Sequence, residues 1–105
     1  MSDTLEDLYK TLQSRKGADP EKSYSAKLFA GGLPVISRKL GEEVVETAIA
    51  ALTSDEDGVV NESADVLYHL LALWAHMDIE PDQIWRELER RTAQSGIEEK
   101  NSRDK

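Results

Sequence analysis

Five acidic residues in the middle of the chain fall into two groups whose types and spacing suit metal binding. Glu42, Glu43 and Glu46 form the first group, and Glu62 and Asp65 form the second. A helix turns by about 100° per residue, so Glu42 and Glu43 fall on either side of Glu46, and Glu62 and Asp65 share one face. Carboxylates gathered in this way repel one another and take up protons unless a cation compensates their charge. Such oxygen ligands suit a hard divalent ion such as Mg²⁺.

A turn between the two groups would bring them together. Residues 53–58 read Thr-Ser-Asp-Glu-Asp-Gly and are rich in turn and capping residues, with Ser54 placed to open a capping box. If two antiparallel helices fold back about Ser54, the first acidic group faces the second, with Glu46 opposite Glu62 and Glu43 opposite Asp65. We therefore expect all five acids to converge in one pocket.

The competing interpretation is that these acids form a solvated helix surface, which is the usual role of an isolated acidic pattern. Here both groups are flanked by apolar residues. The second helix is apolar around most of its circumference and leaves one polar strip, made of Glu62, Asp65, His69 and His76. A helix of this kind is expected to be largely buried, which favours the metal site.

Other side chains on these helices have a structural and a functional interpretation. His69 follows Asp65 by one turn, and a structural hydrogen bond is favoured over metal ligation. Trp74 and Trp85 are expected in the core or in a subunit interface rather than stacked on a base. Ser23 and Tyr24 have two equal alternatives, since they either contact substrate or only cap a short helix.

Length and composition exclude several classes of protein. A chain of 105 residues forms one domain, and its small size favours a homo-oligomer. The net charge of −8, from 21 acids and 13 bases, argues against a nucleic-acid binder. There is no cysteine, the N-terminus lacks the apolar core of a signal peptide, and no stretch approaches a membrane-spanning length. We expect a cytoplasmic protein.

Apolar periodicity and Gly/Pro punctuation predict an all-α fold, a helical bundle of four main helices plus a short one, completed by dimerisation. The expected elements are a helix ending near residues 15–17, a short helix at 23–30, and three longer helices at 34–53, 55–77 and from Pro81 onward. Gly31 and Gly32 should stop the short helix, and Pro34 suits the first turn of the next one. The domain spans residues 1–94, and residues 95–105 form a polar tail.

The paired acidic pattern resembles the metal-binding signature of the MazG-like superfamily of all-α nucleotide pyrophosphatases. Further segments resemble one family within it, the phosphoribosyl-ATP pyrophosphatases of histidine biosynthesis. These segments are Ser23-Tyr24-Ser25-Ala26-Lys27-Leu28, Arg38-Lys39-Leu40-Gly41-Glu42-Glu43, Glu62-Ser63-Ala64-Asp65-Val66-Leu67-Tyr68-His69-Leu70-Leu71, Arg90-Arg91 and Ser95-Gly96-Ile97-Glu98-Glu99-Lys100. The likeness runs from about residue 4 to 103.

The resemblance implies hydrolysis of 1-(5-phosphoribosyl)-ATP to 1-(5-phosphoribosyl)-AMP and pyrophosphate, with Mg²⁺ as cofactor. Five carboxylates agree with this chemistry, because a triphosphate cannot approach them without intervening cations. We expect the metal ligands to be Glu43, Glu46, Glu62 and Asp65. Glu42 is expected to act as a further ligand or as the base that orients the attacking water.

Basic side chains must meet the phosphates that the metal does not cover. The candidates are Lys27, Arg38, Lys39, Lys100 and Arg103. The alternative for each one is a role in surface solubility. Two rival functions stay open: another nucleoside-triphosphate pyrophosphatase of the superfamily, or a helical interaction module without catalysis.

Overall fold

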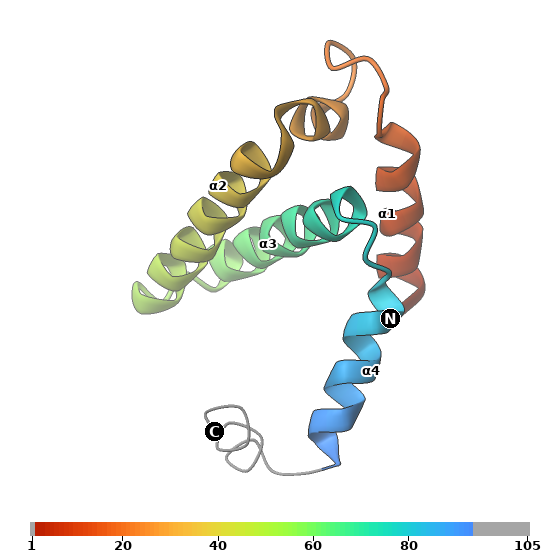
Figure 1. The fold of residues 1–105 in the computed structure, drawn as a ribbon. Helices are drawn as coiled ribbons and strands as arrows, with labels where there is room; N and C mark the ends of the chain where they lie inside the picture. The colour runs from red at the N-terminus through yellow and green to blue at the C-terminus, as the bar shows by residue number, and fades with distance from the viewer. Residues whose placement is uncertain (1, 94–105) are drawn as a thin grey trace.

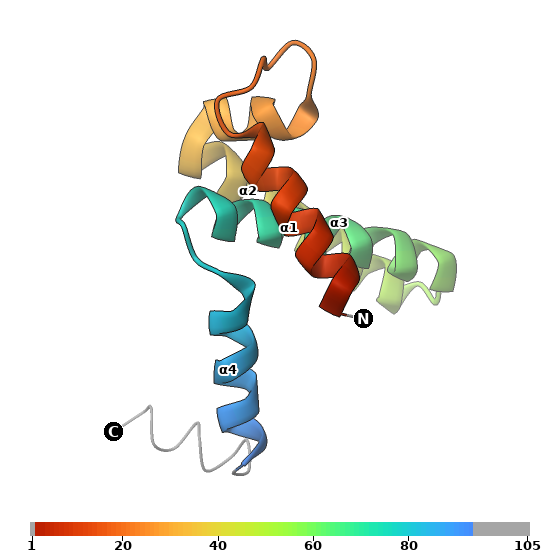
Figure 2. The same ribbon diagram turned by 90° about the vertical axis from the view of Figure 1, so that its right-hand side faces the viewer.

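The computed structural model describes residues 2–93, and within this range every regular element is an α-helix (Figure 1). The helices are α1 (Ser2–Arg15), α2 (Tyr24–Leu52), α3 (Glu56–His76) and α4 (Pro81–Thr92). Helices α2 and α3 form a long hairpin, α1 packs across the end of it where α3 finishes, and α4 leads away (Figures 1 and 2). The predicted all-α fold is confirmed.

Helix α2 consists of two sections that meet at a kink. Gly32 has φ 74° and ψ −170°, a conformation that is essentially restricted to glycine, and Pro34 follows in the first turn of the second section. Ser23 caps the first section by accepting a hydrogen bond from the Ala26 N–H group at 3.2 Å. The short helix and the long helix expected from the sequence are these two sections.

The backbone conformations of two glycines in α2, one at the kink and one in regular helix, predict opposite effects of substitution by alanine. Gly32→Ala is expected to lower the free energy of unfolding by about 1–3 kcal/mol, because alanine is strained at this φ and ψ. Gly41→Ala is the matched control: it lies in regular helix with open space around the added Cβ, and it should stabilise by roughly 0.5–1 kcal/mol. Urea unfolding of both variants checks the two signs, and a neutral Gly32→Ala would contradict this interpretation.

The turn of the hairpin differs by one residue from the expected capping box. Ser54 has φ 59° and is a turn residue, so the expectation that it caps α3 is wrong. Asp55 is the N-cap instead, and its carboxylate accepts a hydrogen bond from the Gly58 N–H group at 2.9 Å. The chain needs a left-handed residue to reverse direction before the cap, and Ser54 is used for that step.

The core lies at the end of the hairpin that α1 covers. Its largest fully buried side chains there are Leu12, Leu28, Ile36 and Leu71. Only the second half of α3 is buried, whereas Val60 in its first half is 71% exposed. The expectation that this helix is largely buried therefore fails for a single copy of the chain.

Two tryptophans join α4 to the core, as expected for structural residues. The ring of Trp85 meets Trp74 edge to face, with 6.1 Å between the ring centroids, and its indole N–H donates to the Glu6 carboxylate at 3.3 Å. No helix among residues 2–93 combines the length and the apolar character needed to cross a membrane.

Candidate active site

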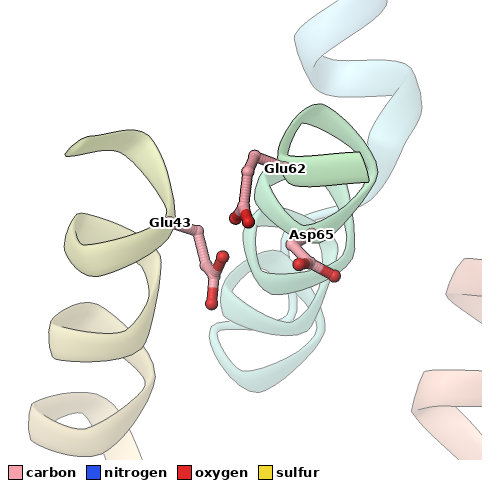
Figure 3. A group of neighbouring side chains, drawn as sticks. All are labelled: Glu43, Glu62 and Asp65. Carbon is pink, nitrogen blue, oxygen red and sulfur yellow. The ribbon is translucent and has the colours of Figure 1, made fainter. Parts of the chain in front are cut away.

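Three carboxylates from the two arms of the hairpin meet in one place. Glu43 points from α2 toward Glu62 on α3, and Asp65 lies beside them one turn further along α3 (Figure 3). One oxygen from each residue lies within 4.8 Å of the others, and all three side chains are half-buried. We call Glu43, Glu62 and Asp65 the acidic cluster. They lie together because the helical spacing and the hairpin turn act in combination.

The acidic cluster contains carboxylate oxygens that lack hydrogen-bond partners and lie close to one another. One carboxylate oxygen of Glu43 and one of Glu62 are buried without a hydrogen-bond partner among the described residues. The pKa of Glu62 is raised, mainly by its contact with the Glu43 carboxyl group and secondly by burial. The pKa of Glu46 is raised mainly by its contact with the Glu62 carboxyl group. Buried oxygens of this kind normally have a partner, so this donor set fits a bound divalent cation.

The other two predicted acids lie at the margin of the acidic cluster. Glu46 is exposed, and its carboxyl group contacts that of Glu62. Glu42 faces two basic side chains, with 3.8 Å to the Lys39 ammonium and 4.0 Å to the Arg38 guanidinium. Glu42 is thus placed between the acids and the bases.

Three of the predicted phosphate-binding residues line a single cavity of about 530 Å³. Lys27 comes from the first section of α2, whereas Arg38 and Lys39 come from the second, so the cavity lies across the kink at Gly32. Leu28 and Val35 contribute apolar surface to it. A cavity of this size with a few charged groups is typical of a small-molecule site. Lys100 and Arg103 fall outside the described residues.

Tyr24 and His69 form a hydrogen bond between the cavity and the acidic cluster. The Tyr24 hydroxyl lies 2.8 Å from His69 Nε2, and His69 Nδ1 lies 2.7 Å from the main-chain oxygen of Asp65. Burial, and then the nearby Tyr68, Glu43 and Asp65, raise the pKa of Tyr24. Both nitrogens of the buried His69 ring are thus occupied, which supports the structural interpretation over metal ligation.

This bond is the feature that sequence reasoning missed. The two residues are 45 positions apart, and no local periodicity connects them. The only signal was that both stand in segments with a family resemblance.

A second hollow is an apolar groove of about 540 Å³ along the outer part of the hairpin. We call it the hairpin groove. Its lining residues come from both α2 and α3, and they are Val44, Thr47, Ala48, Ala51, Ser63, Val66 and Leu67. Val44 and Leu67 are 49% and 43% exposed. Contiguous exposed apolar surface of this kind usually marks an interaction site.

Comparison of the sequence with known proteins places this chain in a family. The family model described as phosphoribosyl-ATP pyrophosphohydrolase matches residues 5–92. A phosphoribosyl-ATP pyrophosphatase from Paramagnetospirillum magneticum is 59% identical over 104 residues, which cover 99% of this chain and 95% of that protein. Proteins of the same name from Azospirillum brasilense and Parvibaculum lavamentivorans are 54% and 52% identical, each over 94% of this chain and over 89% and 91% of the relative. The chain belongs to the phosphoribosyl-ATP pyrophosphohydrolase family.

Proposed function

We propose that this chain hydrolyses 1-(5-phosphoribosyl)-ATP to 1-(5-phosphoribosyl)-AMP and pyrophosphate, a step of histidine biosynthesis, with Mg²⁺ held by Glu43, Glu46, Glu62 and Asp65. Family membership supports the reaction. The observation that carries the metal proposal is the pair of buried, unpartnered oxygens on Glu43 and Glu62.

The reaction breaks the anhydride bond between the α- and β-phosphates. The oxygen of a water molecule forms a bond to phosphorus, the bridging P–O bond breaks, and pyrophosphate leaves. Mg²⁺ bound at the acidic cluster would offset the negative charge of the phosphates and of the leaving pyrophosphate. The phosphate chain can then approach carboxylates that would otherwise repel it.

The remaining predicted residues have roles around this step. Glu42 accepts the proton of the attacking water or adds a further ligand, and its position between acids and bases suits either role. Lys27, Arg38 and Lys39 hold substrate oxygens from the cavity across the kink. Lys100 and Arg103, in the polar tail, are proposed to add further phosphate contacts.

A homodimer is the proposed working form, and the cytoplasm is its proposed compartment. The hairpin groove is the observation that supports dimerisation, because a second copy would cover the apolar surface of the half of the hairpin that α1 leaves exposed. The absence of cysteine suits a reducing compartment.

Pyrophosphate release tests the function directly. The purified chain is supplied with Mg²⁺ and either phosphoribosyl-ATP or a panel of ribo- and deoxyribonucleoside triphosphates. We expect kcat/KM for phosphoribosyl-ATP to exceed that for every other triphosphate. A higher value for an ordinary triphosphate would identify a different pyrophosphatase of the superfamily. If no triphosphate is hydrolysed and Mg²⁺ leaves the melting temperature unchanged, the chain is a non-catalytic helical module.

A further inference from the structure

The hydrogen bond between Tyr24 and His69 joins parts of the site that the kink in α2 otherwise separates. Tyr24 and Lys27 lie in the first section of α2, before Gly32, whereas Glu43 lies in the second section. The cavity takes its lining from both sections, so its shape depends on the angle between them. A contact that holds the first section against α3 therefore controls where the cavity lies relative to the acidic cluster.

The chemistry of the three groups determines which atom donates and which accepts in each of these hydrogen bonds. A main-chain carbonyl only accepts hydrogen bonds, so His69 Nδ1 must carry the proton that it shares with the Asp65 oxygen. In the neutral imidazole, Nε2 is then an acceptor, and the Tyr24 hydroxyl donates to it. The ring of His69 is only 4% exposed, and the rings of Tyr24 and Tyr68 pack around it. The acceptor is thus held in one orientation.

We propose that Tyr24 and His69 are positioning residues, which hold the phosphate-binding cavity in line with the acidic cluster so that the anhydride bond of a bound nucleotide meets the metal. This inference rests on the proposed function. Neither residue takes part in the chemistry itself. Tyr24 acts by fixing the first section of α2, and His69 acts by presenting a hydrogen-bond acceptor one turn beyond Asp65 on α3.

Kinetics of Tyr24→Phe provide the main test. The substitution keeps the ring and removes only the hydroxyl, so kcat for phosphoribosyl-ATP should fall about tenfold through misalignment, while KM changes little. The melting temperature should fall as well, because Nε2 of the buried His69 loses its hydrogen-bond partner. Tyr68→Phe is the matched control, since the Tyr68 ring lies 6.1 Å from that of Tyr24 and its hydroxyl has no hydrogen-bond partner among the described residues. It should keep the kcat of the unchanged protein. A lower melting temperature with unchanged kcat in Tyr24→Phe would reduce the bond to a structural role and overturn the proposal.

Two substitutions of His69 separate its two hydrogen bonds. Asparagine can still donate to the Asp65 oxygen but is too short to reach Tyr24, whereas the longer glutamine can accept from the Tyr24 hydroxyl. We expect His69→Asn to lose as much kcat as Tyr24→Phe and His69→Gln to recover most of it. The double variant Tyr24→Phe/His69→Asn should be no worse than either single variant. Additive losses in the double variant would contradict a shared role.

A spectroscopic measurement tests the bond without any assay of activity. The chain contains only two histidines, so the ¹⁵N signals of the His69 ring can be assigned with a His76 variant. We expect a protonated Nδ1 in the unchanged protein and a shift of the Nε2 signal in Tyr24→Phe but not in Tyr68→Phe. If the unchanged protein fails to hydrolyse phosphoribosyl-ATP, the proposed function fails while this test of the bond stands. If the unchanged protein is active and Tyr24→Phe has the same kcat, the positioning role is refuted and the proposed function stands.

Discussion

Glu62→Gln is expected to lower kcat for phosphoribosyl-ATP by about a thousandfold or more, because the proposed Mg²⁺ would contribute several kcal/mol of charge stabilisation to the transition state and this variant would weaken its site. Glu62 is the central member of the acidic cluster: it contacts Glu43 and Glu46 and lies within reach of Asp65. Glutamine has the same shape but only one ligating oxygen and no charge. Pyrophosphate release at saturating Mg²⁺ gives the loss, and the far-ultraviolet circular dichroism should stay helical.

The same variant should have the opposite effect on stability when no metal is present. The pKa of Glu62 is raised in the folded protein above its ordinary value of 4.5, so ionisation of this carboxyl opposes folding. Its contribution to stability is present below pH 4.5 and is lost as the pH rises through the folded pKa. In a chelator at neutral pH, Glu62→Gln should therefore melt at a higher temperature than the unchanged protein, and this difference should vanish below pH 4.5.

Added Mg²⁺ should reverse that order, because it stabilises only the protein that binds it. The control is Glu89→Gln, which makes the same change of charge on the exposed face of α4. It should retain turnover and the rise in melting temperature with Mg²⁺. Turnover close to normal in Glu62→Gln, or an equal response of both variants to Mg²⁺, would remove the acidic cluster from the mechanism.

The meeting of the two acidic groups was predictable because it depends on local rules. Helical periodicity sets which acids share a face, and the polar segment around Ser54 sets where the chain reverses. The turn itself was misassigned by one residue, since Ser54 and Asp55 are both good capping types and only the backbone conformation distinguishes them. Similarly, Gly32 and Pro34 marked a break in the sequence, but they did not indicate that the two sections would flank a cavity.

The Tyr24–His69 bond was out of reach of sequence reasoning because it joins residues that are distant in the chain. Burial of the first half of α3 is a different case. Its apolar circumference predicts that the helix is covered, and dimerisation is the predicted cover, which a single copy of the chain does not test. One copy of the chain covers only its second half, and side chains such as Val60 stay exposed.

Leu67→Glu tests whether a second copy covers the rest. Leu67 lines the hairpin groove and is 43% exposed, so in a monomer the substitution should change stability little. In a two-fold symmetric dimer it places an uncompensated carboxylate in the interface twice, at a cost on the order of several kcal/mol per subunit. We expect the dimer to dissociate at micromolar concentration, as measured by sedimentation equilibrium.

Dissociation should also lower turnover, because the groove lies on the same two helices that carry Glu43 and Glu62. Within the described residues α1 packs at the other end of the hairpin, so in a monomer only the contacts between α2 and α3 themselves would hold this part in place. Leu88→Glu is the control, since Leu88 is similarly exposed but lies on α4, which projects away from the hairpin (Figure 2). A monomeric Leu67→Glu that keeps full kcat would separate catalysis from assembly. A dimer that survives Leu67→Glu but not Leu88→Glu would move the interface to α4.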